Sequence, residues 1–337
     1  MTDNERFARQ TRLPQVGSDG QKLLSQATVA IVGVGALGCV SADWLCRAGI
    51  GKLILVDRDV VTLSNLQRQV LFTDHHAASH TPKAAAAQDR LSQINPECEI
   101  VAHCADLGNH NINQVIAEAD IVVDGCDNFY TRYLVNDFCV KNSIPFIYAG
   151  AVATYGMVAL FKNGKSCLRC LFPEPPPAAQ SPTCASAGVL GPTIGVVAST
   201  ASSLAIKQLV APNTDSCFIT IETWPFETNN IDLPDNSSCP CCNEGKYPWL
   251  DGEISHPQAS SNCDNTEVHF AGSGFIDLMQ LGDKHKGQLD NLVYSNFCLS
   301  FCHADSEVMV FSDRSIKVFN CDSIEDATQI IEDTIGL

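Results

Sequence analysis

The 337-residue sequence is poor in basic residues: 21 lysines and arginines stand against 38 aspartates and glutamates, and the formal net charge is −17. Binding to nucleic-acid phosphates needs a basic face. We therefore expect no nucleic-acid partner. The negative charge is concentrated near the C-terminus, because residues 251–337 carry −11 of the total.

The chain also lacks two kinds of apolar segment. Its first residues, MTDNERFARQTRLPQ, have no apolar core of the length that a secretory signal peptide needs. We therefore expect a cytoplasmic protein, whose 17 cysteines serve as thiols, metal ligands or catalytic groups rather than as disulfides. Residues 184–206 are uncharged and long enough to span a bilayer. Their many small residues and Pro192 instead predict a loop and a closely packed buried helix, so no membrane span is expected.

Residues 28–150 alternate between apolar runs and helical segments. A buried strand, a glycine-rich turn and a helix lead to a second strand that ends at Asp57, and ADIVVDGCDN and IPFIYAG supply further buried strands. This alternation predicts a mostly parallel sheet covered on both faces. The expected fold class is α/β, a Rossmann-like nucleotide-binding domain that continues into a mixed sheet, with a small α+β appendage at the C-terminus.

Composition divides the chain into three parts. We expect a first domain over residues 1–250, built from an N-terminal helical arm (1–27), a nucleotide-binding half (28–150) and a second half (151–250). A polar linker (251–265) and a small acidic α+β domain (266–337) follow. In the small domain, EVMVFSDRSIKVF predicts a hairpin, and Ser323 is the expected N-cap of a final helix.

Residues 33–38, GVGALG, match the G-x-G-x-x-G pattern between a strand and a helix. Gly33, Gly35 and Gly38 permit a tight turn and close phosphate approach, and the following helix N-terminus favours an anion. Asp57 follows Gly38 by 19 residues and is placed to hold ribose hydroxyls. The pattern alone fits an NAD-dependent oxidoreductase as well as an ATP enzyme.

The segment after Asp57 favours ATP. Residues 64–69, SNLQRQ, form a polar cluster for which a dehydrogenase has no evident use. Arg68 and Lys83 together can neutralise a triphosphate, which carries more charge than a dinucleotide. Asp127 and Asn128 lie in the turn after a buried strand, where a carboxylate can hold Mg²⁺ through water.

Cysteines in the second half follow a metal-binding spacing. The two C-x-x-C pairs are Cys167 with Cys170 and Cys239 with Cys242. Two such pairs supply the four thiolates that structural zinc takes; a redox pair and unliganded thiols are the alternatives. Cys241 does not fit the spacing and is either a spare thiol or an alternative ligand. Cys184 stands alone before a helix, where a thiol can be reactive; the alternative is a loop cysteine with no essential role, because no histidine partner is visible.

In their order along the chain, RFARQ, VGVGALGC, LVDRDVVTLSNLQRQ, PKA, INP, DGCDN, CLRC, TCASAGVLGP and CPCC resemble the motifs of the ThiF/MoeB adenylyltransferases, relatives of the ubiquitin-activating enzymes. The resemblance covers roughly residues 5–245. It implies a homodimeric nucleotidyltransferase that uses ATP and Mg²⁺ to adenylate the terminal glycine of a small ubiquitin-like sulfur-carrier protein ending in Gly-Gly. A separate protein is expected to donate sulfur.

The resemblance also implies roles for single residues. Asp57 binds the ribose, Mg²⁺ lies near Asp127, and Arg9 reaches the phosphates of the other subunit. The cysteine of ThiF-like relatives that matches Cys184 can bond covalently to the carrier. The expected nucleotide contacts are Gly33, Gly35, Gly38, Asp57, Ser64, Asn65, Arg68, Lys83, Asp127 and Asn128, and the expected zinc ligands are Cys167, Cys170, Cys239 and Cys242. The chain departs from the family at Ala36 and near His80, where relatives often have glycine.

Three alternatives stay open at this point. Adenylation of a ribosomal peptide during natural-product maturation keeps every motif. An NAD-dependent oxidoreductase keeps the glycine turn but performs hydride transfer. A non-catalytic scaffold binds a partner without exchanging pyrophosphate into ATP.

Overall fold

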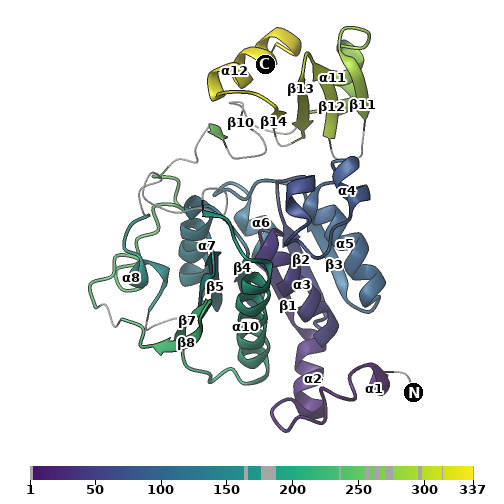
Figure 1. Ribbon diagram of the computed structural model, residues 1–337. Helices are drawn as coiled ribbons and strands as arrows, with labels where there is room; N and C mark the ends of the chain where they lie inside the picture. Colours follow the sequence, from purple (N-terminus) through teal and green to yellow (C-terminus); the bar gives the residue numbers. More distant parts are fainter. Residues whose placement is uncertain are drawn as a thin grey trace. The chain divides into compact units, whose positions relative to one another are not determined.

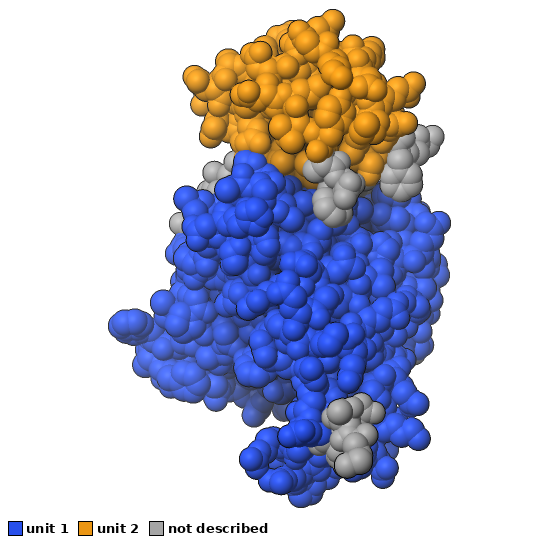
Figure 2. Space-filling model, turned by 90° about the vertical axis from the view of Figure 1, so that its right-hand side faces the viewer, with its two compact units in different colours: residues 1–255 blue, residues 256–337 orange. Residues whose placement is uncertain are grey.

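The chain divides into two compact units in the computed structural model: unit 1, residues 1–255, and unit 2, residues 256–337 (Figure 2). Unit 1 is built on an eight-stranded sheet and unit 2 on a six-stranded sheet. The structure describes residues 3–162, 166–175, 187–234, 237–254, 259–261, 266–269, 276–294, 298–312 and 314–336.

The sheet of unit 1 has the strand order β3-β2-β1-β4-β5-β6-β7-β8 (Figure 1). Its parallel part consists of β3 (Glu99–His103), β2 (Lys52–Val56), β1 (Thr28–Val32), β4 (Ile121–Asp124) and β5 (Phe146–Val152). The antiparallel part consists of β6 (Tyr155–Phe161), β7 (Cys217–Thr223) and β8 (Phe226–Ile231). The predicted Rossmann-like half that continues into a mixed sheet is confirmed.

Both faces of this sheet are covered, because successive side chains of each strand point to opposite faces. Val29 and Ile31 of β1 enter one core, whereas Ala30 and Val32 enter the other. The first core is covered by α2 (Gly17–Gln26), α3 (Ala36–Ala48), α5 (Lys83–Ile94) and α10 (Gly191–Val210). The second is covered by α6 (Ile112–Ile116), α7 (Phe129–Asn142) and α8 (Leu168–Leu171). Shorter helices are α1 (Asp3–Arg6), η1 (Leu63–Asn65) and α4 (Asp74–Ala78).

Helix α10 is the packed helix expected within the uncharged stretch. It is also the one described helix that is long and apolar enough to cross a membrane. Its buried positions include Ile194, Val197, Ala198 and Ala201, and it packs along α3 and against β5 and β6 (Figure 1). Small side chains let the two helices approach closely. The helix is therefore part of the core of unit 1.

The sheet of unit 2 is antiparallel, with the order β11-β12-β13-β14-β10-β9. Its strands are β9 (Ala259–Ser261), β10 (Thr266–His269), β11 (Asp290–Tyr294), β12 (Cys298–His303), β13 (Ser306–Phe311) and β14 (Ser315–Phe319). Helices α11 (Leu278–Lys284) and α12 (Ile324–Thr334) complete its apolar core.

Two local predictions in unit 2 are confirmed, and one region differs from the expectation. Strands β13 and β14 form the predicted hairpin, and the Ser323 hydroxyl caps α12 by accepting the N–H of Asp326 at 3.0 Å. Strand β9, however, lies within the predicted linker. Its sequence, ASS, carries no apolar alternation, and it is a strand because its backbone pairs with β10 at the sheet edge.

Candidate functional site

The glycine-rich turn between β1 and α3 packs directly on the turn after β4. Gly33 has φ +87°, and a Cβ there would lie 2.6 Å from the carbonyl of Gly125. A Cβ at Gly38 would collide with the Gly33 carbonyl oxygen. The two turns can meet only because all three positions lack side chains. Gly125, in the DGCDN motif, was not singled out from the sequence.

Gly35 has a different environment, because the space beside it is open. It is the N-cap of α3, and the nearest atom to a Cβ there would be the Gly125 oxygen, at 3.8 Å. The 13-residue helix α3 therefore begins at a half-buried glycine with little side-chain atom density beside it. Such a helix terminus favours a phosphate group.

Asp57 follows β2 and is fixed beside this turn. Its Oδ2 accepts the N–H of Val34 at 2.6 Å, and its Oδ1 accepts the N–H of Asp59 at 2.7 Å. Burial raises the pKa of Asp57 to about 6, although the Lys83 ammonium acts in the opposite direction. At neutral pH the group is a carboxylate held next to the phosphate-favouring turn, as hydrogen bonding to ribose hydroxyls requires.

Lys83 is the first residue of α5 and is only 8% exposed. Its Nζ lies 3.0 Å from Oδ2 of Asp59, and its backbone N–H donates to the Asp59 carbonyl at 2.8 Å. Burial lowers the pKa of Lys83, but Asp59, Asp57 and Asp127 outweigh it and raise this pKa above its ordinary value. The side chain therefore stays an ammonium ion.

Asp59 is a residue that the sequence analysis missed. It binds Lys83 through both its side chain and its backbone, and it also donates its N–H to Asp57. The sequence feature that could have indicated Asp59 is the second aspartate of VDRD (56–59), two positions after Asp57, the expected ribose ligand.

The SNLQRQ segment forms a compact turn around η1. The N–H of Thr62 donates to Asn65 Oδ1 at 3.2 Å, and Asn65 is buried. The half-buried Arg68 donates from its guanidinium to the carbonyl of Ser64 at 2.9 Å. Asn65 therefore stabilises the η1 turn, and the hydrogen bond to Ser64 within this turn orients Arg68.

Asp127 and Asn128 stand at the start of α7. Asn128 caps this helix by accepting the N–H of Thr131 at 2.9 Å, and Asp127 is exposed. Below them, Arg132 pairs with Asp124 at 2.9 Å and donates to the Cys126 carbonyl. This buried pair fixes the turn and leaves the Asp127 carboxylate open to solvent.

Arg132 is also enclosed by aromatic rings. Its guanidinium carbon lies 5.5 Å from the ring centre of Phe129 and 5.2 Å from that of Tyr148. Burial lowers the pKa of Arg132, but the neighbouring Asp124 raises it, so the ion pair persists. An ion pair with additional hydrogen bonds and ring contacts is a rigid support for the turn.

The structure thus brings most predicted nucleotide residues to one edge of the sheet. The glycine turn, Asp57 and Lys83 are joined by direct contacts, and the charge of Asp127 acts on Lys83. Arg9 is exposed between α1 and α2, and among the described residues no ion pair or side-chain hydrogen bond joins it to this edge. Cys184 lies outside the described residues.

The two departures from the family pattern differ in their effect on the backbone. Ala36 is the first residue of α3 and takes an ordinary helical place. His80 has φ +42°, in the left-handed region that favours glycine. The backbone here has therefore kept a conformation suited to glycine while carrying a histidine.

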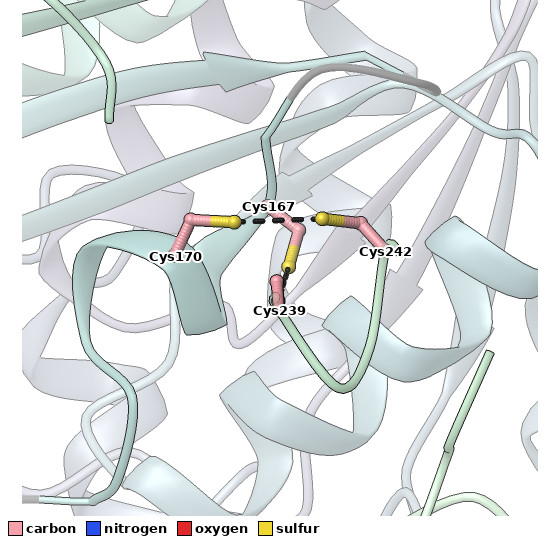
Figure 3. Close-up of side chains that lie close together, drawn as sticks. All are labelled: Cys167, Cys170, Cys239 and Cys242. Carbon is pink, nitrogen blue, oxygen red and sulfur yellow. Dashed lines mark hydrogen bonds between the residues drawn. The ribbon is translucent and has the colours of Figure 1, made fainter. Parts of the chain in front are cut away.

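The four cysteines of the two C-x-x-C pairs converge, as Figure 3 shows. The Sγ atoms of Cys167 and Cys239 are 3.7 Å apart, those of Cys170 and Cys242 are 3.4 Å apart, and all four lie within 4.8 Å of one another. Tetrahedral zinc with Zn–S bonds of about 2.3 Å separates its sulfurs by about 3.8 Å. The cluster can therefore hold a metal ion.

Comparison with known proteins identifies related sequences. Residues 7–241 match the ThiF family. The "Sulfur carrier protein ThiS adenylyltransferase" of Bacillus subtilis is 34% identical over 98% of this chain and 99% of its own length. The "Sulfur carrier protein adenylyltransferase" of Thermus thermophilus is 37% identical over 71% of this chain and 91% of its own length.

Solved structures show the same fold. A crystal structure of Escherichia coli MccB with MccA-N7isoASN superposes with a TM-score of 0.63 and 21% identity. The superposition covers 72% of this chain and 75% of that one. At this identity the likeness concerns the fold alone.

The contact between Asp59 and Lys83 can be tested through the pH dependence of ATP binding. In Asp59→Asn the burial of Lys83 is no longer opposed by that charge, so the pKa of Lys83 falls and the ammonium is lost as pH rises. We expect the affinity for ATP to fall between pH 7 and pH 9 by about tenfold more in Asp59→Asn than in the unaltered protein, a difference of about 1.4 kcal/mol. Isothermal titration calorimetry of both proteins measures the two dissociation constants.

The matched control is Asp43→Asn, which removes a carboxylate that pairs with Arg47 on α3. It should leave ATP affinity unchanged at both pH values. Equal affinities of Asp59→Asn and the unaltered protein at pH 7 and pH 9 would show that Asp59 does not support Lys83.

Proposed function

This chain belongs to the ThiF family, and we propose that it adenylates the C-terminal glycine carboxylate of a small ubiquitin-like sulfur-carrier protein, at the expense of ATP and in the cytoplasm. The relatives named sulfur carrier adenylyltransferases support this substrate class. The observation that carries the proposal is the pair of buried Lys83 with half-buried Asp59, which lies beside Asp57 and the N-terminus of α3. Peptide adenylation is the weaker alternative, since the MccB likeness extends to the fold only.

The proposed reaction is an in-line displacement at the α-phosphorus. A carboxylate oxygen of the carrier bonds to this phosphorus, the bond to the β-phosphate oxygen breaks, and pyrophosphate leaves together with the electron pair. The acyl-adenylate remains. Asp57 holds the ribose, while Lys83 and Arg68 neutralise phosphate charge, so that catalysis depends on positioning and electrostatic stabilisation.

Mg²⁺ and Arg9 of the other subunit are the two further cations of the proposed site. Asp127 is an exposed carboxylate of the kind that binds Mg²⁺ directly or through water, and the ion would neutralise charge on the departing phosphates. Arg9 would reach the same phosphates in the other subunit of a homodimer. Its exposed position in the N-terminal arm is compatible with this role.

The cysteine cluster is proposed to bind zinc in a structural role. Cys167 and Cys170 come from the segment after β6, and Cys239 and Cys242 from the segment after β8. Four protein thiolates leave no open coordination position, as is usual for structural zinc. The ion would therefore join two segments that are 72 residues apart without taking part in the reaction.

Sulfur transfer is proposed to pass through Cys184. Its thiolate would attack the acyl carbon, AMP would leave, and a thioester to the carrier would form. A separate donor protein would then deliver sulfur at the sulfide level to the acyl carbon, the bond from this carbon to Cys184 would break, and the Cys184 thiolate would leave as the thiocarboxylate forms.

The hairpin of β7 and β8 is the proposed docking point for the globular part of the carrier. Trp224 and Phe226 at its tip are 76% and 67% exposed. The pairing of Val152 with Tyr155, and of Tyr155 with Glu222, places this tip at the edge where β5 ends. The nucleotide residues follow β2 and β4 at that same edge, because β4 and β5 are parallel.

The distance along this edge suits a flexible carrier tail. Four strand spacings separate β4 from β8, and at about 4.8 Å each they amount to about 19 Å. An extended chain covers this distance with about six residues. A carrier held at Trp224 and Phe226 can therefore place its terminal carboxylate at the nucleotide site.

Adenylation is tested by the exchange of labelled pyrophosphate into ATP with candidate carriers ending in Gly-Gly. We expect exchange only when a carrier is present, and a loss of about a hundredfold in Asp127→Ala and Arg68→Ala, since each removes transition-state stabilisation. Glu97→Ala, which removes an exposed carboxylate elsewhere on unit 1, should retain full exchange. Hydride transfer to a nicotinamide without pyrophosphate exchange would contradict the proposal.

The covalent step is tested with Cys184→Ala. Pyrophosphate exchange should persist, because adenylation does not use the thiol, whereas carrier thiocarboxylate should not accumulate when the sulfur donor is added. Mass spectrometry of the carrier measures this product. A full yield of thiocarboxylate from Cys184→Ala would remove the covalent step and leave adenylation intact.

The docking surface is tested with the double substitution Trp224→Ala and Phe226→Ala. The KM for the carrier should rise at least tenfold, because about 2 kcal/mol or more of apolar contact is lost, while kcat and ATP affinity stay unchanged. Met279→Ala removes an exposed apolar side chain of unit 2 and serves as the control. An unchanged KM in the double variant would exclude the hairpin as the docking point.

A further inference from the structure

Cys241 stands between two proposed zinc ligands and packs in the same buried cluster beside Cys167, but its Sγ is not among the four that all lie within 4.8 Å of one another. It is fully buried. Its Sγ accepts a hydrogen bond from Asn136 Nδ2 at 3.3 Å and donates one to Asp137 Oδ1 at 3.4 Å. Both partners are neighbouring residues of α7. The thiol is therefore bonded to protein side chains on its donor side and on its acceptor side.

The same two residues of α7 also hold the segments around the cluster. Asn136 Oδ1 accepts the N–H of Leu168, the residue after Cys167, at 2.8 Å. Asp137 Oδ2 accepts the N–H of Trp249, which follows the second C-x-x-C pair, at 3.1 Å. One turn of helix thus binds the first cysteine pair, the second pair and the segment after it.

The surroundings of this turn are tightly packed. The rings of Tyr133 and Trp249 lie 4.6 Å apart, and the guanidinium carbon of Arg169 lies 5.1 Å from the centre of the Trp249 ring. The hydroxyl of Tyr133 donates to the carbonyl of Phe172 at 2.7 Å. Because so many contacts meet at α7, Asn136 and Asp137 cannot shift without moving both cysteine segments.

We infer that Cys241 is a positioning residue of the metal centre, a thiol that binds no metal and instead fastens the second cysteine pair to α7. Asp137 as a carboxylate can only accept hydrogen bonds, so the sulfur supplies the proton in their contact. Asn136 supplies the opposite bond. The pair Cys239 and Cys242 is held toward Cys167 and Cys170 through this link. The inference rests on the proposed zinc centre.

Hydrogen bonds that orient the ligands of a metal ion change metal affinity about 10- to 100-fold in metalloproteins. The experiment follows zinc transfer from the full-length loaded enzyme to a chelating dye. We expect Cys241→Ala to release zinc about 10- to 100-fold faster than the unaltered enzyme. Cys241→Ser should restore slow release, because a hydroxyl keeps both the donor and the acceptor.

Cys139→Ala is the matched control. Cys139 is a buried thiol of α7, the helix that carries Asn136 and Asp137, and it is not one of the four converging sulfurs. It should lower thermal stability as much as Cys241→Ala does, yet leave the release rate unchanged. A release rate in Cys241→Ala equal to that of the unaltered enzyme would overturn the inference. A second result would also overturn it: zinc binds tightly to Cys242→Ser, and this binding is lost when Cys241 is replaced in the same protein. Cys241 would then be a zinc ligand.

Pyrophosphate exchange on the same preparations separates this inference from the proposed function. A wild-type enzyme that exchanges pyrophosphate but takes up no zinc would overturn the metal centre and the role of Cys241 together, with adenylation intact. An enzyme that binds zinc but exchanges no pyrophosphate with any carrier leaves the role of Cys241 standing and removes the proposed function.

Discussion

The direct backbone contact between the β1–α3 turn and the β4–α7 turn determines the rest of the nucleotide site. Gly33, Gly38 and Gly125 have no side chains at the points where these turns meet, and a Cβ at any of the three would strike backbone atoms. The contact fixes the N-terminus of α3, and Val34 in the same turn donates its N–H to Asp57. The proposed contacts to phosphate, ribose and metal therefore all depend on this one contact between two turns.

Helix α7 extends this arrangement into the second half of unit 1. Its first turn carries the Asn128 cap, its second turn carries Arg132 in the ion pair with Asp124, and its third carries Asn136 and Asp137. An ion pair that is removed from water is favourable only when further hydrogen bonds satisfy it. Arg132 meets that condition through the carbonyls of Cys126 and Ala149. The nucleotide turn and the cysteine cluster are therefore supported by the start and the middle of one helix.

The sequence was informative wherever a function depends on local spacing. The glycine turn, Asp57 and the two C-x-x-C pairs are local patterns, and the structure places them as expected. Roles that depend on distant contacts did not follow from the sequence, which left Cys241 without an assigned role and gave no role to Asp59. Cys241 meets Asn136 and Asp137 across more than 100 residues, and no spacing rule reports such a contact. Asp59 was missed because its importance follows from the burial of Lys83, which only the packed structure reveals.

The charge balance at the nucleotide edge supports the proposals on metal and subunit. Within one chain the edge contributes Lys83 and Arg68 as cations but Asp57, Asp59 and Asp127 as carboxylates. One carboxylate is already engaged with Lys83 at 3.0 Å, so little positive charge is left for a triphosphate with about four negative charges. At short range, unbalanced charges of this size cost several kcal/mol even at an effective dielectric constant of about 20. ATP binding at this edge therefore requires cations from outside this set, which the proposed Mg²⁺ at Asp127 and the proposed Arg9 of a second subunit would supply.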